Sequence, residues 1–186
     1  MRIIVGITGA TGAIYGVRAL ERLREQGVET HLVLSRWGAQ TLVHETSYTR
    51  EQVEALAHTT YAQGDMGAAV SSGSFHTNGM LIAPCSAKSL AAIAHGFADN
   101  LIHRAADVVL KERRKLVLVV REAPLSDIHL ENMLKLSRMG AVMLPPMPAF
   151  YNKPRSVDEI VEHTVARLLD QFGVEVPGAA RWSGEM

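Results

Sequence analysis

The sequence has little that could crosslink the chain, hold a metal or anchor it in a membrane. Cys85 is the single cysteine among 186 residues, and no apolar run approaches the ~18 residues that a membrane span needs. One cysteine cannot form an internal disulfide and suits a reducing cytoplasm. The sequence has no His-Glu-x-x-His segment and no cysteine pair, so no metal-ligand spacing is present. We therefore expect a cytoplasmic protein with no metal and no membrane partner.

Neither sign of charge is in excess. Lys+Arg and Asp+Glu number 19 each, whereas proteins that bind nucleic acid usually carry a basic excess. We therefore expect no nucleic-acid partner. The chain opens on a strand-like segment, so we expect no signal peptide before it. The length suits one domain over residues 1–186, in which residues 173–186 form a C-terminal tail that we expect to dock at a subunit interface.

The most informative stretch is residues 2–16, Arg-Ile-Ile-Val-Gly-Ile-Thr-Gly-Ala-Thr-Gly-Ala-Ile-Tyr-Gly. Its continuous apolar run is typical of a strand buried on both faces in a parallel sheet. Small residues from Gly9 to Gly12 then form a turn, and a helical pattern starts near Ala13. Unpaired amides at a helix start favour an anion, and glycine permits its close approach. This pattern predicts a phosphate ligand, although a tight turn without a ligand remains open.

The turn does not match the dinucleotide fingerprint Gly-x-Gly-x-x-Gly. It is closer to the glycine turn of short-chain dehydrogenases, but Tyr15 stands where the last glycine belongs. None of the four tyrosines has the lysine four residues later that those enzymes use. The second strand ends in Leu34-Ser35-Arg36, with no acidic residue for an adenosine ribose, so only a weak NADP hypothesis through Arg36 remains.

Strand and helix patterns alternate along the chain, which predicts an α/β protein whose parallel sheet carries helices on both faces. The predicted strands cover 3–7, 30–34, 80–83, 116–120 and 141–144, and the predicted helices cover 13–26, 37–45, 50–58, 90–95, 100–114, 128–139 and 156–172. Residues 61–78 read as an unusually long loop, of a kind that is functional or disordered. Hydroxyls, glycine and cations follow the strands, which predicts a phosphate-ligand site at the carboxyl edge of the sheet.

Several long motifs resemble those of the UbiX-like flavin prenyltransferases, including the subunits that accompany bacterial non-oxidative hydroxyaryl acid decarboxylases. They span nearly the whole chain: Gly9-Ala-Thr-Gly-Ala13, Ser71-Ser-Gly-Ser-Phe75, residues 104–113, residues 116–124, residues 128–136 and Pro148-Ala-Phe-Tyr151. The resemblance implies a flavodoxin/Rossmann-like three-layer fold with a mostly parallel sheet. It also implies a homododecamer with active sites shared between subunits. The implied activity joins a dimethylallyl group from dimethylallyl phosphate to reduced FMN, at N5 and C6, for use by a UbiD-type decarboxylase.

The resemblance also implies site residues. Positions that match FMN contacts are Gly9, Ala10, Thr11, Ser35, Ser86, Ala87, Lys88, Ser89 and Arg121. Positions that match the prenyl-phosphate site are Tyr151 and Arg167, with Lys111, Arg121 and Glu122 as further phosphate partners. Independently of this match, Trp182 offers an aromatic face for the allylic cation. Glu45 matches the acid/base carboxylate. Thr11 stands where many members have serine, which keeps the hydroxyl and adds a methyl group.

Without the resemblance, most of these residues have ordinary explanations. Lys111 and Arg167 would be solvated charges, Glu45 a surface carboxylate, and Tyr151 an interface aromatic. Cys85 is expected to be a buried structural residue, since no base is assigned to it. Arg121-Glu122 is the exception, because polar residues that close a buried strand at the ligand edge indicate function unaided.

The chemistry explains this set of residues. An allylic phosphate that loses its phosphate leaves an anion, which preorganised cations stabilise, and an allylic cation, which an aromatic face stabilises. Protein cations make a metal unnecessary, and no acidic cluster is present to hold a diphosphate–metal complex, so we expect a monophosphate donor. The proline-rich bend with Met143, Met147, Phe150 and Tyr151 is expected to pack on neighbouring chains. Two alternatives remain: a flavin-dependent decarboxylase of the same superfamily, and a non-catalytic accessory subunit.

Overall fold

The computed structural model describes residues 1–182 and 184; residues 183, 185 and 186 of the predicted tail lie outside the described part. Its strands are β1 (Arg2–Ile7), β2 (Glu29–Leu34), β3 (Thr59–Tyr61), β4 (Gly79–Cys85), β5 (Lys115–Val120) and β6 (Val142–Met143). They form one sheet in the order β3-β2-β1-β4-β5-β6, and all neighbouring pairs are parallel. This is the strand order of the Rossmann doubly wound sheet. From the boundary between β1 and β4, the chain adds its strands first toward one edge of the sheet and then toward the other.

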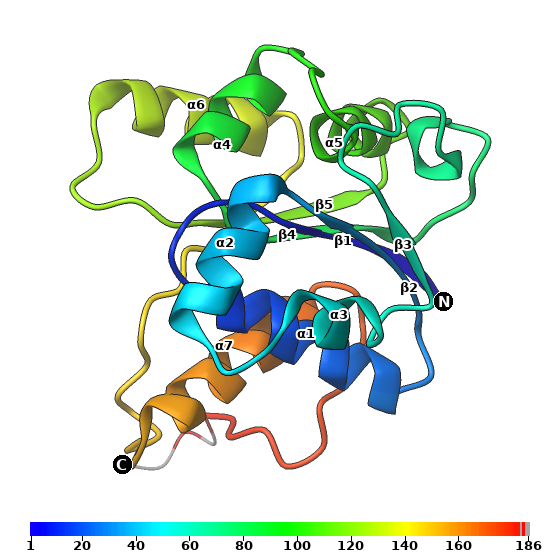
Figure 1. Cartoon of the computed structure of the whole chain (residues 1–186). Helices are drawn as coiled ribbons and strands as arrows, with labels where there is room; N and C mark the ends of the chain where they lie inside the picture. Colours follow the sequence, from blue (N-terminus) through cyan, green and yellow to red (C-terminus); the bar gives the residue numbers. More distant parts are fainter. Residues whose placement is uncertain (183, 185–186) are drawn as a thin grey trace.

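Helices cover both faces of this sheet (Figure 1). They are α1 (Ala13–Glu25), α2 (Arg36–Glu45), α3 (Arg50–Glu54), α4 (Ala87–Ala94), α5 (Leu101–Lys111), α6 (Asp127–Arg138) and α7 (Val157–Asp170), with a short 3-10 turn at Ala69–Ser71. Helices α1 and α7 lie on one face and α4, α5 and α6 on the other. The predicted three-layer fold is confirmed. Within the described residues, no helix combines the length and apolarity needed to cross a bilayer.

The apolar runs of the sequence become strands because both faces of the sheet are covered. In β1, Ile3 and Val5 join the core beneath α1 and α7, whereas Ile4 joins the core beneath α4 and α5. Gly16 lets α1 approach closely, because a Cβ there would lie 2.3 Å from the Ala83 carbonyl oxygen on β4. The glycine that packs the helix on the sheet is therefore Gly16, one residue after Tyr15.

The sequence prediction is wrong at the sheet edge. The helix expected over 50–58 ends at Glu54, and Thr59–Tyr61 form β3, which pairs with His31–Val33 of β2. The long loop therefore begins after Tyr61 rather than at it. A three-residue strand carries too little periodicity to be found locally, and its extended conformation comes from the open edge of β2.

Candidate active site

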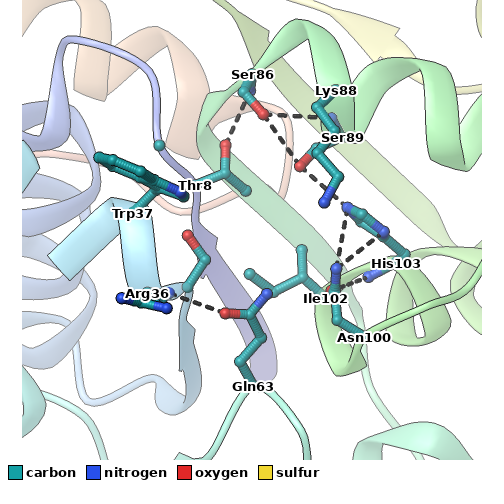
Figure 2. A pocket seen from close by; sticks show the side chains of 12 residues that line it. Thr8, Arg36, Trp37, Gln63, Ser86, Lys88, Ser89, Asn100, Ile102 and His103 are labelled. Atoms are coloured by element: carbon teal, nitrogen blue, oxygen red, sulfur yellow. Dashed lines mark hydrogen bonds between the residues drawn. The ribbon is translucent and has the colours of Figure 1, made fainter. Parts of the chain in front are cut away.

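A cavity of about 510 Å³ opens at the point where the strand order reverses (Figure 2). Its walls come from the carboxyl end of β1, the starts of α2, α4 and α5, and the beginning of the long loop. Its lining residues are Thr8, Gly9, Ser35, Arg36, Trp37, Gln63, Ser86, Lys88, Ser89, Asn100, Ile102 and His103. The predicted residues Gly9, Ser35, Ser86, Lys88 and Ser89 thus lie in one cavity, whereas Ala10 lies in the adjacent turn and Ala87 is the first residue of α4.

Thr8 fixes the geometry of this cavity. Its hydroxyl donates a hydrogen bond to the Pro84 carbonyl (2.8 Å) and accepts one from the Ser86 amide (2.8 Å). These bonds tie the end of β1 to the end of β4, the two strands that flank the reversal. The long loop is anchored here too. The side-chain oxygen of Gln63 accepts a hydrogen bond from the Arg36 amide (2.8 Å), and the main-chain carbonyl of Gln63 accepts one from the Leu101 amide (2.9 Å).

Two of the three helices that begin at the cavity, α2 and α4, are capped by a serine. Ser35 accepts from the Gly38 amide (2.9 Å) at the start of α2, and Ser86 accepts from the Ser89 amide (3.2 Å) at the start of α4. Both helix dipoles therefore direct partial positive charge at the same space. A Cβ on Gly9 would lie 2.4 Å from the Trp37 Cβ, so no larger residue fits in this wall. Hydroxyls, amides and an aromatic side chain fit a phosphorylated aromatic ligand such as FMN.

A chain of hydrogen bonds that the sequence analysis missed lies behind these serines. The Ser86 hydroxyl lies 3.2 Å from the Ser89 hydroxyl, which lies 3.1 Å from His103 Nε2. His103 Nδ1 in turn lies 2.7 Å from the Asp99 carboxylate, and Lys88 approaches the same carboxylate at 3.7 Å. Because a carboxylate only accepts, Nδ1 carries the proton and Nε2 accepts from Ser89. The four-residue spacing of Asp99 and His103 at a helix start is the signal that could have revealed the pair.

The environment of His103 keeps its ring neutral. Burial lowers the pKa of His103, and the hydrogen bond to Asp99 offsets this only in part. Burial works to raise the pKa of Asp99, but the bond from His103 and the charge of Lys88 hold that pKa below its ordinary value. A neutral His103 is the state in which Ser89 can donate to Nε2.

The lowered pKa of His103 predicts acid sensitivity. As the pH falls below the ordinary histidine pKa of ~6.5, the unfolded chain takes up a proton that the folded chain refuses, so stability falls. We expect His103 to contribute up to about 1.4 kcal/mol per pH unit between ~6.5 and its lower folded pKa. Denaturant melts at pH 7.5 and 5.5 should show a larger loss for wild type than for His103→Gln. Equal losses would contradict this assignment.

Glu45 serves as the N-terminal cap of α1. Its Oε2 accepts hydrogen bonds from the amides of Gly12 (2.8 Å) and Ala13 (3.2 Å). Gly12 has φ +99° and no side chain with which to cap the helix, so Glu45 supplies the acceptor from α2. Glu45 is the last residue of α2, where the dipole of α2 disfavours a negative charge. The dipole of α1, at whose start the carboxylate lies, favours that charge. This contact, 33 residues apart in sequence, explains why the carboxylate lies at the glycine turn.

A second cavity of about 510 Å³ lies beside this cap. Its lining includes Thr11, Gly12, Tyr15, Glu45 and Arg121. The glycine turn contributes Gly9 to the first cavity and Gly12 to the second, so the two spaces share one wall. Glu122 follows Arg121 and is exposed, and its carboxylate accepts from the Ala123 amide (3.1 Å).

A third cavity, of about 400 Å³, gathers the residues predicted to hold the prenyl phosphate. Tyr151, Arg167 and Trp182 line it together with Ala180 and Arg181. The Tyr151 and Trp182 rings meet edge to face, with centroids 5.6 Å apart. Arg181, which the sequence analysis missed, makes two bonds of 2.8 and 2.9 Å to Asp170, and Arg167 makes one of 3.2 Å. The bond from Arg181 holds the pKa of Asp170 below its ordinary value.

Lys111 is a predicted phosphate partner that lies far from these cavities in a single subunit. Helix α5 starts at the first cavity and runs about 16 Å, at 1.5 Å per residue, to Lys111 at the opposite edge of the sheet. There its ammonium pairs with Glu112. Sequence order alone could not reveal this separation, because it depends on the direction in which α5 crosses the sheet.

Other predictions can be placed directly. Cys85 is fully buried, and burial raises its pKa to about 12, which agrees with a structural role. In the proline-rich bend, Met147 and Phe150 are 73% and 71% exposed, so their packing on neighbours stays a prediction. Met143 lies in β6 and packs in part against the subunit's own core, and its packing on neighbours also stays a prediction.

Comparisons with known proteins agree over the whole chain. A model of the Flavoprotein family matches residues 1–169. A probable UbiX-like flavin prenyltransferase of Bacillus subtilis (strain 168) is 62% identical over 184 residues, which cover 99% of this chain and 90% of that protein. A dodecameric FMN-dependent UbiX-like decarboxylase from Escherichia coli O157:H7 superposes with a TM-score of 0.98 at 62% identity, over 99% of this chain and all of that one. AnUbiX (PadA1), solved with FMN and dimethylallyl pyrophosphate, has a TM-score of 0.98 at 52% identity, over 100% of this chain and 98% of that one.

Proposed function

The chain belongs to the Flavoprotein family and, within it, to the UbiX-like flavin prenyltransferases, and from this premise we propose that it joins a dimethylallyl group to reduced FMN. One observation carries the proposal: a cavity of hydroxyls and helix N-termini shares its glycine turn with a second cavity that holds Glu45 and Arg121. The first fits FMN as a substrate. The second fits the reacting end of that substrate, with a carboxylate and a cation at hand.

The reaction forms two bonds between the dimethylallyl group and the flavin. The allylic carbon–oxygen bond of dimethylallyl phosphate breaks, the phosphate leaves with the electron pair, the carbon joins N5 of the reduced flavin, and the N5 proton passes to the departing phosphate. The second bond forms at C6 once a proton is added to the prenyl alkene and the C6 proton is removed. Arg121, Arg167 and Tyr151 stabilise the departing phosphate. Glu45 handles the two protons, since its Oε2 is held by α1 amides and Oε1 is left for the chemistry.

Assembly completes this site. A related protein is described as dodecameric, and we propose the same assembly here. Two features support it: Lys111 lies at the far edge of its own subunit, and Met147 and Phe150 are exposed in the bend next to Tyr151. Each site then takes Lys111 from a neighbour. The described part of the tail, residues 173–182, docks at the same interface in this proposal, because its Trp182 contacts Tyr151 beside the exposed bend.

The product serves a separate enzyme in this proposal. A UbiD-type decarboxylase in the cytoplasm receives the prenylated flavin, a role that the family resemblance supports. A flavin-dependent decarboxylase is the competing function, and one structural relative is described as an FMN-dependent decarboxylase. An accessory subunit without activity is the other. Both alternatives require no change in the covalent structure of FMN.

Anaerobic incubation with reduced FMN and dimethylallyl phosphate separates these functions. We expect the mass of the flavin to rise by one dimethylallyl group, with and without EDTA. A parallel reaction with the pyrophosphate should be much slower, because the donor site as assigned supplies cations and no acidic cluster for a metal. NADPH should show no saturable binding. Unchanged flavin in both donor reactions would overturn the proposal.

Single substitutions should distinguish the residues that bind dimethylallyl phosphate from those that bind FMN. We expect Arg167→Ala and Tyr151→Phe to raise the KM for dimethylallyl phosphate about 10–100-fold, the range for losing a hydrogen bond to a charged group. Both should leave FMN affinity unchanged, because these residues line the third cavity. Arg121→Ala should weaken both. Lys135→Ala, on the exposed face of α6, is the control for a general loss of positive charge. Wild-type KM in Arg167→Ala would contradict the assigned phosphate site.

A further inference from the structure

A buried histidine lies directly behind Tyr151. His163, on α7 one turn before Arg167, is only 8% exposed. Its Nε2 lies 3.1 Å from the Tyr151 hydroxyl oxygen, and the two rings meet edge to face with centroids 5.6 Å apart. His163 also lines a cavity of about 410 Å³ together with Asn152 and Glu159. The reaction as proposed above assigns no role to His163.

The other ring nitrogen fixes the direction of this hydrogen bond. His163 Nδ1 is shielded from solvent and has no hydrogen-bond partner among the described residues. A neutral imidazole carries one N–H, and a buried N–H without an acceptor is rarer in proteins than an acceptor without a donor. The tautomer with its proton on Nε2 therefore fits this site. In that tautomer His163 donates and the Tyr151 oxygen accepts.

The consequence reaches the third cavity. A phenol proton lies near the ring plane and can point to either side of the oxygen. Since His163 fills one side with its own N–H, the Tyr151 proton points to the other side. Tyr151 lines the same cavity as Arg167, so the hydroxyl is set to donate where the arginine offers its charge.

We propose that His163 is a positioning residue that holds the Tyr151 hydroxyl as a hydrogen-bond donor to the prenyl phosphate. The proposal rests on the proposed function, in which Tyr151 contacts that phosphate. His163 itself touches neither substrate. As charge develops on the departing phosphate, the Tyr151 hydroxyl donates without first having to break a bond to His163, and the chained donors reinforce each other.

Variants that keep or remove the donor at position 163 test the idea. His163→Phe preserves the flat ring and removes the N–H, and His163→Gln preserves an N–H donor. We expect His163→Phe to raise the KM for dimethylallyl phosphate about 3–10-fold, the effect of one neutral hydrogen bond, with unchanged FMN affinity. His163→Gln should stay within about twofold of wild type. If the phenylalanine variant does not fold, His163→Met, which also lacks a donor, replaces it.

A double-mutant cycle separates positioning from packing. In a Tyr151→Phe background no hydroxyl remains to orient, so His163→Phe should cause no further rise in KM. An equal rise in both backgrounds would show a packing effect and overturn the proposal, as would a wild-type KM in His163→Phe alongside a raised KM in Tyr151→Phe. If Tyr151→Phe itself keeps the wild-type KM, the proposed role of Tyr151 fails and the role of His163 with it.

Discussion

Glu45→Gln is expected to form the first prenyl–flavin bond at N5 and then to close the ring about 10²–10⁴-fold more slowly than wild type, the usual contribution of general acid–base catalysis. Phosphate departure needs no proton from Glu45, whereas closure at C6 needs one proton added and one removed. The glutamine carbonyl can still accept from the Gly12 and Ala13 amides, so the start of α1 stays intact. Mass spectrometry of the flavin over time measures both steps.

Glu45→Ala is the matched control for the structural part of this residue. It removes the acceptor as well as the acid, so α1 loses its only side-chain cap among the described residues. We expect a stability loss of about 0.5–2 kcal/mol in the alanine variant and little loss in the glutamine variant. Ring closure by Glu45→Gln at the wild-type rate would remove this carboxylate from the mechanism.

Two inactive variants are expected to regain activity when they assemble together. Lys111→Ala should lower kcat/KM for dimethylallyl phosphate about 10²-fold, the scale of a lost charge-assisted contact in the transition state. Subunits that carry Lys111→Ala and subunits that carry Glu45→Gln, mixed equally and reassembled, should recover activity at about a quarter of the sites. The reason is that, in the proposed symmetric assembly, each site takes these two residues from different chains. Rates of the mixture and of the two parents measure the recovery.

The matched control is a mixture of Glu45→Gln and Arg121→Ala subunits. These two residues line one cavity of one chain, so no reassembled site can hold both native residues. This mixture should show no recovery. If the Lys111→Ala mixture also stays at the average of its parents, Lys111 does not act on a neighbour's site.

The sequence by itself determined the features that depend on near neighbours. The apolar runs of β1 and β5 predict buried strands. When helices cover both faces of a sheet, the side chains that point to either face must be apolar. The serines before α2 and α4 are caps because a hydroxyl reaches an amide three residues later. Long motifs in the right order also sufficed to identify the family, which the comparisons confirm.

Only the tertiary structure decided the contacts between distant segments. Glu45 reaches the start of α1 because β2 lies next to β1, and no local pattern encodes that pairing. The short strand β3 exists because β2 has an open edge, and Lys111 leaves the site because α5 runs away from it. His103 contacts Ser89, which is 14 residues away in sequence, and His163 contacts Tyr151, which is 12 residues away. Spacing rules extend over one or two helical turns, and beyond them the folded sheet selects which side chains meet.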